Sequence, residues 1–405
     1  MRPGIITPTI RILSLVSLLT DVASEMLYPV MPVFLRSIGF SFLLIGVLEG
    51  VAEATAGLSK SYFGEKSDRI GKRLPFVQIG YAFSAISKPM MAAFVYPWWI
   101  FFARMFDRLG KGIRTGARDA MLSDESSIEN KGRVFGFHRS MDTVGAVIGP
   151  ALALGYLYYH PGHYKALFLI AFLPGVLAIL LTLLIKEKRH SPEVNNQAPG
   201  DSLKKNKQPV SLFAFYTYWK KSSTEYKRLM SGFLLFAMFN SSDVFLLLKM
   251  KESGLHDTAV IGVYIFYNLI YALMAYPIGM LADRLGMKNV FLTGLFIFAI
   301  VYTGFATNSS TSVYFLLFFL YGIYAAATEG ISKAWISNIV PGTETATAIG
   351  TYTGLQSICL LMASSLTGFL WFRFGSIVTF TTTAGVTLIV IAYLYYFHKT
   401  PAVVH

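Results

Sequence analysis

Two pairs of charged residues stand inside apolar segments of the chain, and the members of each pair are four positions apart. Asp21 and Glu25 form the first pair, and Arg104 and Arg108 form the second. Residues at this spacing lie on the same face of a helix. Burial favours the protonated form of a carboxylic acid, so the first pair is a candidate for carrying a proton. Arginine binds carboxylate or phosphate through two parallel hydrogen bonds, so the second pair is a candidate for binding an anion.

Further polar residues occur in other apolar segments. Asp142 is another candidate for proton transfer. His138 could titrate near neutral pH, although a single buried histidine is more often only hydrogen-bonded, and the sequence leaves both roles open. The second half of the chain is sparser and offers mainly Asn240, Asp243 and Glu329. A network of salt bridges that only holds helices together is the alternative for each residue. We favour a functional set, because buried ion pairs are an expensive replacement for apolar packing.

The segments that carry these residues have the composition of membrane helices. The chain has 405 residues, of which 54% are hydrophobic and 14% are charged, whereas soluble domains have roughly 25% charged residues. A bilayer core is spanned by about 20 apolar residues in a helix. The sequence therefore predicts an all-α integral membrane protein with twelve spans, at 10–36, 41–63, 75–95, 97–121, 130–158, 163–186, 229–250, 257–281, 288–307, 312–338, 344–371 and 376–398.

One long hydrophilic stretch divides the spans into two groups of six. It predicts an N-terminal bundle at 1–186, a linker at 187–228 and a C-terminal bundle at 229–405. An aromatic run from Phe213 to Trp219 predicts a short helix on the membrane surface. Lysines and arginines concentrate in the linker and in the loops after spans two, four and eight. The positive-inside rule therefore predicts a cytoplasmic linker and cytoplasmic termini, in the inner membrane.

Composition and motifs argue against several other classes of protein. The formal net charge is +13, but the basic residues lie between apolar segments instead of forming a nucleic-acid groove. The single cysteine, Cys359, excludes a disulfide within the chain. The sequence has no metal-ligand cluster, nucleotide loop or nucleophile motif. We therefore expect neither an enzyme nor a bound cofactor.

A short motif occurs once in each half of the chain. The string GEKSDRIGKR begins at Gly64, and the string GMLADRLGMK begins at Gly279. Both follow the pattern G-x-x-x-D-R-x-G and stand at the ends of topologically equivalent spans. The pattern selects Gly64, Asp68, Arg69, Gly71, Asp283 and Arg284 as a set with a common role. Repeated halves are the expected build of many secondary transporters.

The first string resembles the signature G-x-x-x-D-R-x-G-[RK]-[RK] of the major facilitator superfamily at every fixed position, and the resemblance covers the whole chain. In span four, Arg108 to Gly112 resembles the R-x-x-x-G motif that is tied to proton coupling in drug antiporters of that family. In span five, Gly145 to Pro150 resembles the antiporter motif G-x-x-x-G-P, although Ala153 and Leu154 replace the glycine pair that often follows.

The resemblance implies a central cavity lined by spans one, four, seven and ten. It implies a substrate site made of Arg104, Arg108, Tyr28, Asn240, Asp243 and Glu329. The buried acids and the histidine of the charged spans give a candidate proton-coupling group made of Asp21, Glu25, Asp142 and His138. The first half would hold the charges, and the sparser second half would supply an apolar or aromatic wall. Tyr264, Tyr267 and Tyr271, which share a face of span eight, are assigned to packing.

The resemblance further implies a latch between the halves. Asp68 is expected against the start of span eleven near Thr343, where a helix N-terminus carries about half a positive charge. Arg69 would then pair with Asp119 or Asp124. These contacts would form when the cytoplasmic side is closed.

The repeat implies a second latch of the same kind. Asp283 would face the start of span five, near Ser127 to Asn130.

These features predict a monomeric secondary transporter that moves a small organic solute, anionic or polar, by alternating access. Protons would couple to this movement, so an ion gradient would supply the energy in place of a cofactor. Its partners would be the lipid bilayer, the solute and protons, with no nucleic acid. The antiporter motif favours efflux. The alternatives are a proton symporter that imports an anionic metabolite or a metal chelate such as a ferric siderophore, and a non-transporting membrane sensor.

Overall fold

The computed structural model describes residues 5–28, 30–31, 34–35, 38–39, 42–160, 162–186, 214–241, 243–255, 257–307 and 310–397. The regular elements in these ranges are all helical, which confirms the predicted fold class. The helices are α1 (Pro8–Glu25), α3 (Phe42–Ile70), α4 (Leu74–Ala93), α5 (Pro97–Asp124), α6 (Lys131–Tyr159), α7 (Tyr164–Thr182), α8 (Ala214–Lys221), α9 (Thr224–Ala237), α10 (Val244–Glu252), α11 (Asp257–Leu285), α12 (Met287–Thr307), α13 (Thr311–Ile339) and α14 (Thr345–Phe397). Short 3-10 turns at Ile128–Asn130 and Gly342–Glu344 precede α6 and α14.

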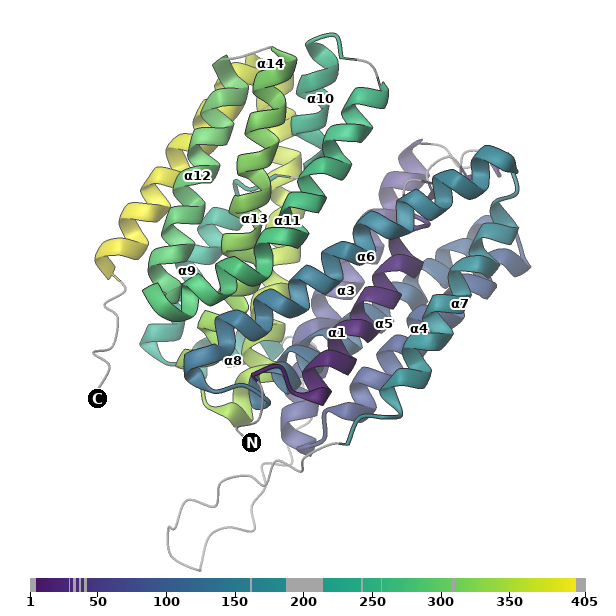
Figure 1. Ribbon diagram of the computed structural model, residues 1–405, viewed down its shortest axis with the longest axis horizontal. Coiled ribbons are helices and arrows are strands. Elements are labelled where there is room, and N and C mark those ends of the chain that lie inside the picture. Colours follow the sequence, from purple (N-terminus) through teal and green to yellow (C-terminus); the bar gives the residue numbers. More distant parts are fainter. Residues whose placement is uncertain are drawn as a thin grey trace, which may run out of the picture.

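The helices form two bundles that meet along a central seam (Figure 1). In the N-terminal bundle, α1 packs on α6 and α7, and α4 packs on α5 and α7. In the C-terminal bundle, α13 packs on α11 and α12, and α14 packs on α9 and α12. The bundles contact each other where α6 lies beside α11 and where α3 lies beside α14. The seam is therefore built twice, by equivalent helix pairs of the two halves.

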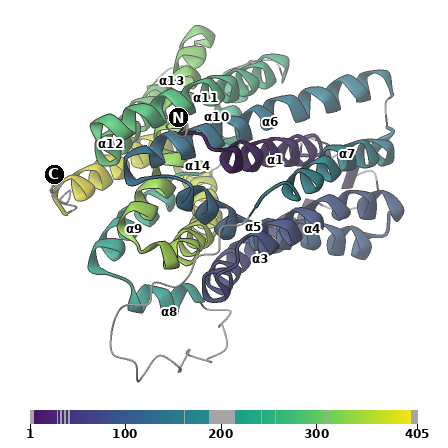
Figure 2. The same ribbon diagram turned by 60° about the horizontal axis from the view of Figure 1, so that its bottom comes forward.

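Helix α8 lies against α3 and α14 at one end of the molecule (Figure 2). It coincides with the aromatic run for which a short helix was predicted. Helix α9 begins at Thr224, inside the segment predicted as linker, and the residues 187–213 of that linker lie outside the described ranges. We call the end that holds α8, Asp68 and Asp283 the linker side of the molecule.

The outer surface of the bundles is apolar, as lipid contact requires. Helix α7 illustrates this arrangement, since Leu169, Leu173, Leu177 and Leu180 are all more than half exposed. The other face of α7 is buried and holds small residues such as Ala171. By length and composition, six helical stretches in the described part of the chain are apolar enough to cross a membrane. Helix α5 does not reach that threshold because it carries a charged face, which must therefore meet protein or water.

Three predicted spans differ from the helices that form. The span predicted at 229–250 is interrupted, because α9 ends at Ala237 and α10 begins only at Val244. The spans predicted at 344–371 and 376–398 are joined into α14, with a break at Gly375. Gly375 has φ = 82°, a left-handed conformation that glycine adopts without steric cost.

Candidate functional site

A cavity of about 520 Å³ lies between the two bundles. Its N-terminal wall comes mainly from α1, α5 and α6, and its C-terminal wall comes mainly from α11, α13 and the break between α9 and α10. The predicted substrate residues Tyr28, Arg104, Arg108, Asn240, Asp243 and Glu329 all line it, as do the predicted proton-coupling residues Asp21, Glu25 and Asp142. The structure thus brings together residues that the sequence selected from both halves.

The two walls of the cavity differ in charge. The N-terminal wall contributes the cations Lys60, Arg104, Arg108, Lys111, Arg114, Arg118 and Arg139 and the carboxylates Asp21, Glu25, Asp107 and Asp142. The C-terminal wall contributes the carboxylates Asp243 and Glu329, the cation Lys333 and the phenols Tyr264, Tyr267, Tyr271, Tyr321 and Tyr324. The first wall therefore has an excess of positive charge, and the second has a small excess of negative charge within a tyrosine-rich surface.

His138 does not line the cavity. Its ring is buried inside the N-terminal bundle, with Nδ1 3.3 Å from the Ser14 hydroxyl oxygen. His138 is thus enclosed by α1 and α6 and lies outside the cavity lining, and its part in proton coupling stays a prediction.

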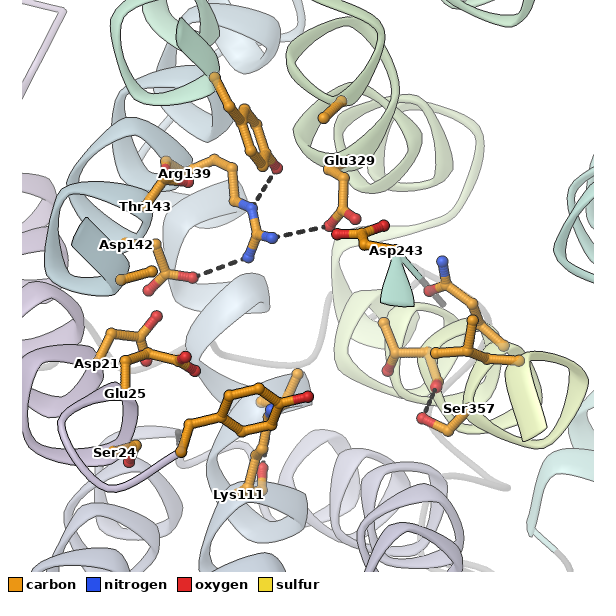
Figure 3. A pocket seen from close by; sticks show the side chains of 18 of the residues that line it. Asp21, Ser24, Glu25, Lys111, Arg139, Asp142, Thr143, Asp243, Glu329 and Ser357 are labelled. Carbon is orange, nitrogen blue, oxygen red and sulfur yellow. Dashed lines mark hydrogen bonds and ion pairs between the residues drawn. The ribbon is translucent and has the colours of Figure 1, made fainter. Parts of the chain in front are cut away.

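Arg139 joins the two walls at the centre of the cavity (Figure 3). Its guanidinium lies 3.0 Å from Asp142 on the same helix and 3.0 Å from Glu329 on α13. It also donates a hydrogen bond to the Tyr271 hydroxyl on α11. One arginine of the N-terminal bundle therefore ties together a carboxylate from each bundle. The sequence analysis did not select Arg139, and its only local signal was its position three residues before Asp142.

A second ion pair is buried behind the N-terminal wall. Lys88 of α4 is 2% exposed, and its Nζ lies 2.8 Å from Asp107. The Arg104 guanidinium lies 3.8 Å from the other oxygen of Asp107. Asp107, which also accepts a 3.3 Å hydrogen bond from the Ser87 hydroxyl, thus balances two cations, and Arg104 has a structural contact in addition to its place in the cavity. The isolated lysine in the apolar segment 75–95 was the signal that could have revealed this pair.

The tyrosines of α11, for which packing was favoured over substrate contact, pack between helices and also line the cavity. Tyr264, Tyr267 and Tyr271 all line the cavity. They share one helix face, as the spacing predicted, and that face borders the cavity while Tyr267 also packs against Phe318 and Tyr321 of the neighbouring helix α13. Tyr321 and Tyr324 of α13 extend the same surface, with ring centroids 5.2 Å apart.

The cavity is closed on the linker side by contacts between α3 and α14. The carboxylate of Asp68 accepts hydrogen bonds of 2.7 Å from the backbone nitrogen and from the hydroxyl of Thr347, in the first turn of α14. This is the helix N-terminus that the sequence indicated. Gly64 permits the close approach, because a Cβ there would lie 2.5 Å from the carbonyl oxygen of Ala346.

The arginine of this contact is different from the predicted one. Arg69 pairs with Glu65 one turn earlier on α3. Arg73, beyond the turn, contacts Asp124 and lies 3.3 Å from Asp68. It also donates a 2.7 Å hydrogen bond to the carbonyl oxygen of Gly342. The structure therefore gives to Arg73 the bridging position that the sequence assigned to Arg69.

The same arrangement recurs between α11 and α6. Asp283 accepts hydrogen bonds from the backbone nitrogens of Gly132 (2.8 Å) and Arg133 (2.9 Å) in the first turn of α6, just after the predicted segment Ser127 to Asn130. Gly71 and Gly286 end α3 and α11 with φ of 67° and 87°, so each repeat closes with a left-handed glycine. Arg284 is exposed at this end.

Further contacts between the bundles lie on the same side of the cavity. Lys333 of α13 lies 2.7 Å from Asp119 of α5, and Lys131 donates a 2.6 Å hydrogen bond to the carbonyl oxygen of Ser337. At the surface, the Tyr218 hydroxyl of α8 donates to Glu344 over 3.1 Å. Burial, with Glu344 close by, raises the pKa of Tyr218, which keeps this phenol a neutral donor. The linker side is therefore sealed by polar contacts from α3, α5, α6 and α8.

Comparisons with known proteins agree with this geometry. The family model described as Major Facilitator Superfamily matches residues 13–267 and 229–405. An uncharacterized MFS-type transporter of Methanocaldococcus jannaschii is 31% identical over 392 residues, which cover 92% of each chain. An uncharacterized protein of Mycobacterium tuberculosis is 26% identical over 89% of this chain and 86% of its own length.

Solved structures share the fold at low sequence identity. The human organic anion transporter MFSD10 superposes with a TM-score of 0.79 at 16% identity, over 95% of this chain and 98% of its own. The E. coli fucose:proton symporter FucP superposes with a TM-score of 0.75 at 12% identity, over 96% of this chain and 98% of its own.

Proposed function

The chain belongs to the major facilitator superfamily and is a multi-pass membrane transporter, and we propose that it carries a small anionic or polar organic solute in a cycle coupled to protons. In this proposal the cavity between the bundles is the solute site. The contacts of Asp68 and Asp283 hold the linker side closed in one of two alternating states. The Gly145 to Pro150 motif favours export as the direction.

The observation that carries the proposal is the placement of Arg139. Its guanidinium bridges Asp142 and Glu329 across the cavity, and 33% of its side chain is exposed there. An anionic group of the solute can compete for the guanidinium, because arginine binds carboxylate and phosphate in the same geometry. A carboxylate that loses its arginine partner takes up a proton more readily. Solute binding and proton binding would thereby be linked through one side chain.

The test is counterflow in proteoliposomes. A thermal-shift screen of metabolites and antibiotics first identifies a ligand, because a ligand that binds the folded protein raises its apparent stability. Vesicles preloaded with unlabelled ligand should then accumulate radiolabelled ligand transiently, and an imposed pH gradient should change the final level. Binding without counterflow would contradict a carrier and favour the sensor alternative.

Proton coupling is expected to depend on the acidic pair of α1. Asp21 and Glu25 line the cavity on the same side as Asp142 (Figure 3). At least one of Asp21→Asn and Glu25→Gln should abolish the response to the pH gradient and retain exchange, because each removes a proton site and keeps the shape of the side chain. Glu65→Gln, outside the cavity, is the control. If both variants keep full pH-driven transport, the coupling site is not this pair, and Asp142 is the next candidate.

The linker side is expected to face the cytoplasm. A cysteine introduced as Asn206→Cys in a Cys359→Ser background should resist an impermeant thiol reagent in intact cells, because the lysine-rich linker stays inside. His163→Cys is the matched control on the opposite side, where His163 is exposed between α6 and α7. It should label in intact cells, and Asn206→Cys should label only after permeabilisation. The reverse pattern would invert the orientation.

A further inference from the structure

Asp243 occupies an unusual position in the cavity. It lies in the break between α9 and α10, where the chain leaves the helical path. Its Oδ1 accepts a 2.6 Å hydrogen bond from the Tyr321 hydroxyl, and its Oδ2 accepts a 2.8 Å hydrogen bond from the Tyr267 hydroxyl. Among the described residues, no lysine or arginine pairs with this carboxylate, and its charged neighbour is another carboxylate, Glu329.

This lack of an ion pair separates Asp243 from Asp107, Asp142 and Glu329, while Asp21 and Glu25 have Lys111 as a charged neighbour. Asp107 has Lys88, and both Asp142 and Glu329 have Arg139. Two phenolic hydrogen bonds satisfy only part of an ionised carboxylate, which can accept about four hydrogen bonds. A buried charge without a partner is costly, so a cation from outside the chain would complete the site.

The surface around Asp243 has the form that organic cations prefer. The ring centroids of Tyr264 and Tyr267 lie 5.6 Å apart, and those of Tyr267 and Tyr321 lie 5.4 Å apart. Aromatic faces attract ammonium groups through their quadrupoles, most strongly where water is excluded. A small inorganic cation would instead need several oxygen ligands, whereas both Asp243 carboxylate oxygens already accept hydrogen bonds from tyrosine hydroxyls.

The N-terminal wall, opposite Asp243, indicates which second charge the ligand carries. Lys111 of α5 is exposed and lines the cavity, and within the described part of the chain it forms no ion pair, although Asp21 and Glu25 of α1 are its charged neighbours. Together with the neighbouring arginines, it makes this wall positive. A simple cation would be repelled there, and a simple anion would be repelled by Asp243. A ligand with one charge of each sign satisfies both walls.

We propose that the transported solute is a zwitterion, with an ammonium group held by Asp243 and its tyrosines and an anionic group held by Lys111 and the basic wall. This assignment rests on the proposed function for the idea that the cavity is the solute site. It adds the second charge, because an anionic solute alone leaves Asp243 without a partner.

The test compares zwitterions with isosteric anions in equilibrium binding. The probes are 4-aminobutyrate, 5-aminovalerate and 6-aminohexanoate, each against the fatty acid in which a methyl group replaces the ammonium. Titration calorimetry of the purified full chain should show at least tenfold tighter binding for one amino acid than for its isostere. The corresponding n-alkylamines, which lack the carboxylate, should also bind at least tenfold more weakly. If isostere or amine binds as tightly as the best amino acid, or if none of the amino acids binds, the proposal is wrong.

Two variants separate the ammonium-binding part of the site, at Asp243, from the anion-binding part, at Lys111. Asp243→Asn keeps the shape of the side chain and should remove the preference for the amino acid without changing the affinity of the fatty acid. Lys111→Gln should weaken both ligands. Tyr321→Phe is a milder variant that removes one hydrogen bond to Asp243. It should partly reduce the preference for the amino acid, and it replaces Asp243→Asn as the test if that variant does not purify as a single species. An equal loss of both ligands in Asp243→Asn and in Tyr321→Phe would overturn the assignment.

This experiment keeps the two proposals apart. A zwitterion that binds with the expected preference but shows no counterflow would contradict the carrier function and leave the ligand class intact. Counterflow of a plain anion without any preference for amino acids would support the carrier function and reject the zwitterion.

Discussion

Asp68→Asn is expected to shift the protein about five- to thirtyfold toward the state that is open on the linker side. The Asp68 carboxylate caps the N-terminus of α14 through Thr347 and lies 3.3 Å from Arg73. Asparagine can still accept a hydrogen bond, but it lacks the negative charge that the helix N-terminus and the arginine favour. Such a partly buried contact contributes about 1–2 kcal/mol. Its loss therefore changes the ratio of closed to open protein about five- to thirtyfold. In the proposed cycle the contact forms only in the state closed on the linker side, so its loss acts on that state alone.

The measurement is the distance between spin labels on the two bundles. Lys72→Cys and Thr343→Cys place labels at exposed positions on either side of the latch, in a Cys359→Ser background. Asp68→Asn should add a population at longer distance and reduce net transport, with the protein still folded. Glu65→Gln is the control, because Glu65 pairs with Arg69 on its own helix. An unchanged distance distribution, where the parent is closed, would reject the latch.

The second copy of the motif offers an independent check. Asp283→Asn should produce a shift of the same sign, because Asp283 caps α6 as Asp68 caps α14. The two sites share no contact, so their free-energy effects should add in the double variant. If only one of the two aspartates has an effect, the repeat is not functionally symmetric.

Arg139→Gln is expected to lower the affinity for the transported solute at least tenfold, about 1.4 kcal/mol. The variant removes the guanidinium that bridges Asp142, Glu329 and Tyr271. It also leaves two carboxylates at the cavity without their partner, which disfavours an anionic group. Arg139→Lys keeps the positive charge and should lose less affinity than Arg139→Gln. It should still bind more weakly than the parent, because a lysine ammonium cannot contact all three groups at once.

Titration of the ligand found by thermal shift provides the affinity, and size-exclusion behaviour confirms folding. Arg373→Gln is the matched control, because it removes an exposed arginine that does not line the cavity. The same tenfold loss is expected for Arg104→Ala and Arg108→Ala, which the sequence selected and the cavity contains. Normal affinity in Arg139→Gln would make this residue a structural tie between the bundles.

The sequence by itself determined the class of fold and the position of the latches. Helix-length apolar segments fix where a membrane protein is helical, because the bilayer leaves no other way to satisfy the backbone. The motif that begins at Gly64 combines a small residue, an acid and a helix end at fixed spacing. The family resemblance, together with a helix start after Pro341-Gly342, then implied that Asp68 meets α14. The motif and the helix start are local, so they are readable without the tertiary structure, whereas the pairing came from the resemblance.

Only the tertiary structure decided which side chains meet inside the cavity. Arg139 and Glu329 belong to different bundles, and their contact depends on how far α6 and α13 are rotated about their axes. The same rotation turns Tyr264, Tyr267 and Tyr271 toward the cavity, although the sequence shows only that they share a face. Arg73 replaces Arg69 because the turn at Gly71 redirects the chain. Local spacing cannot specify any of these contacts, since each is set by packing between helices that are distant along the chain.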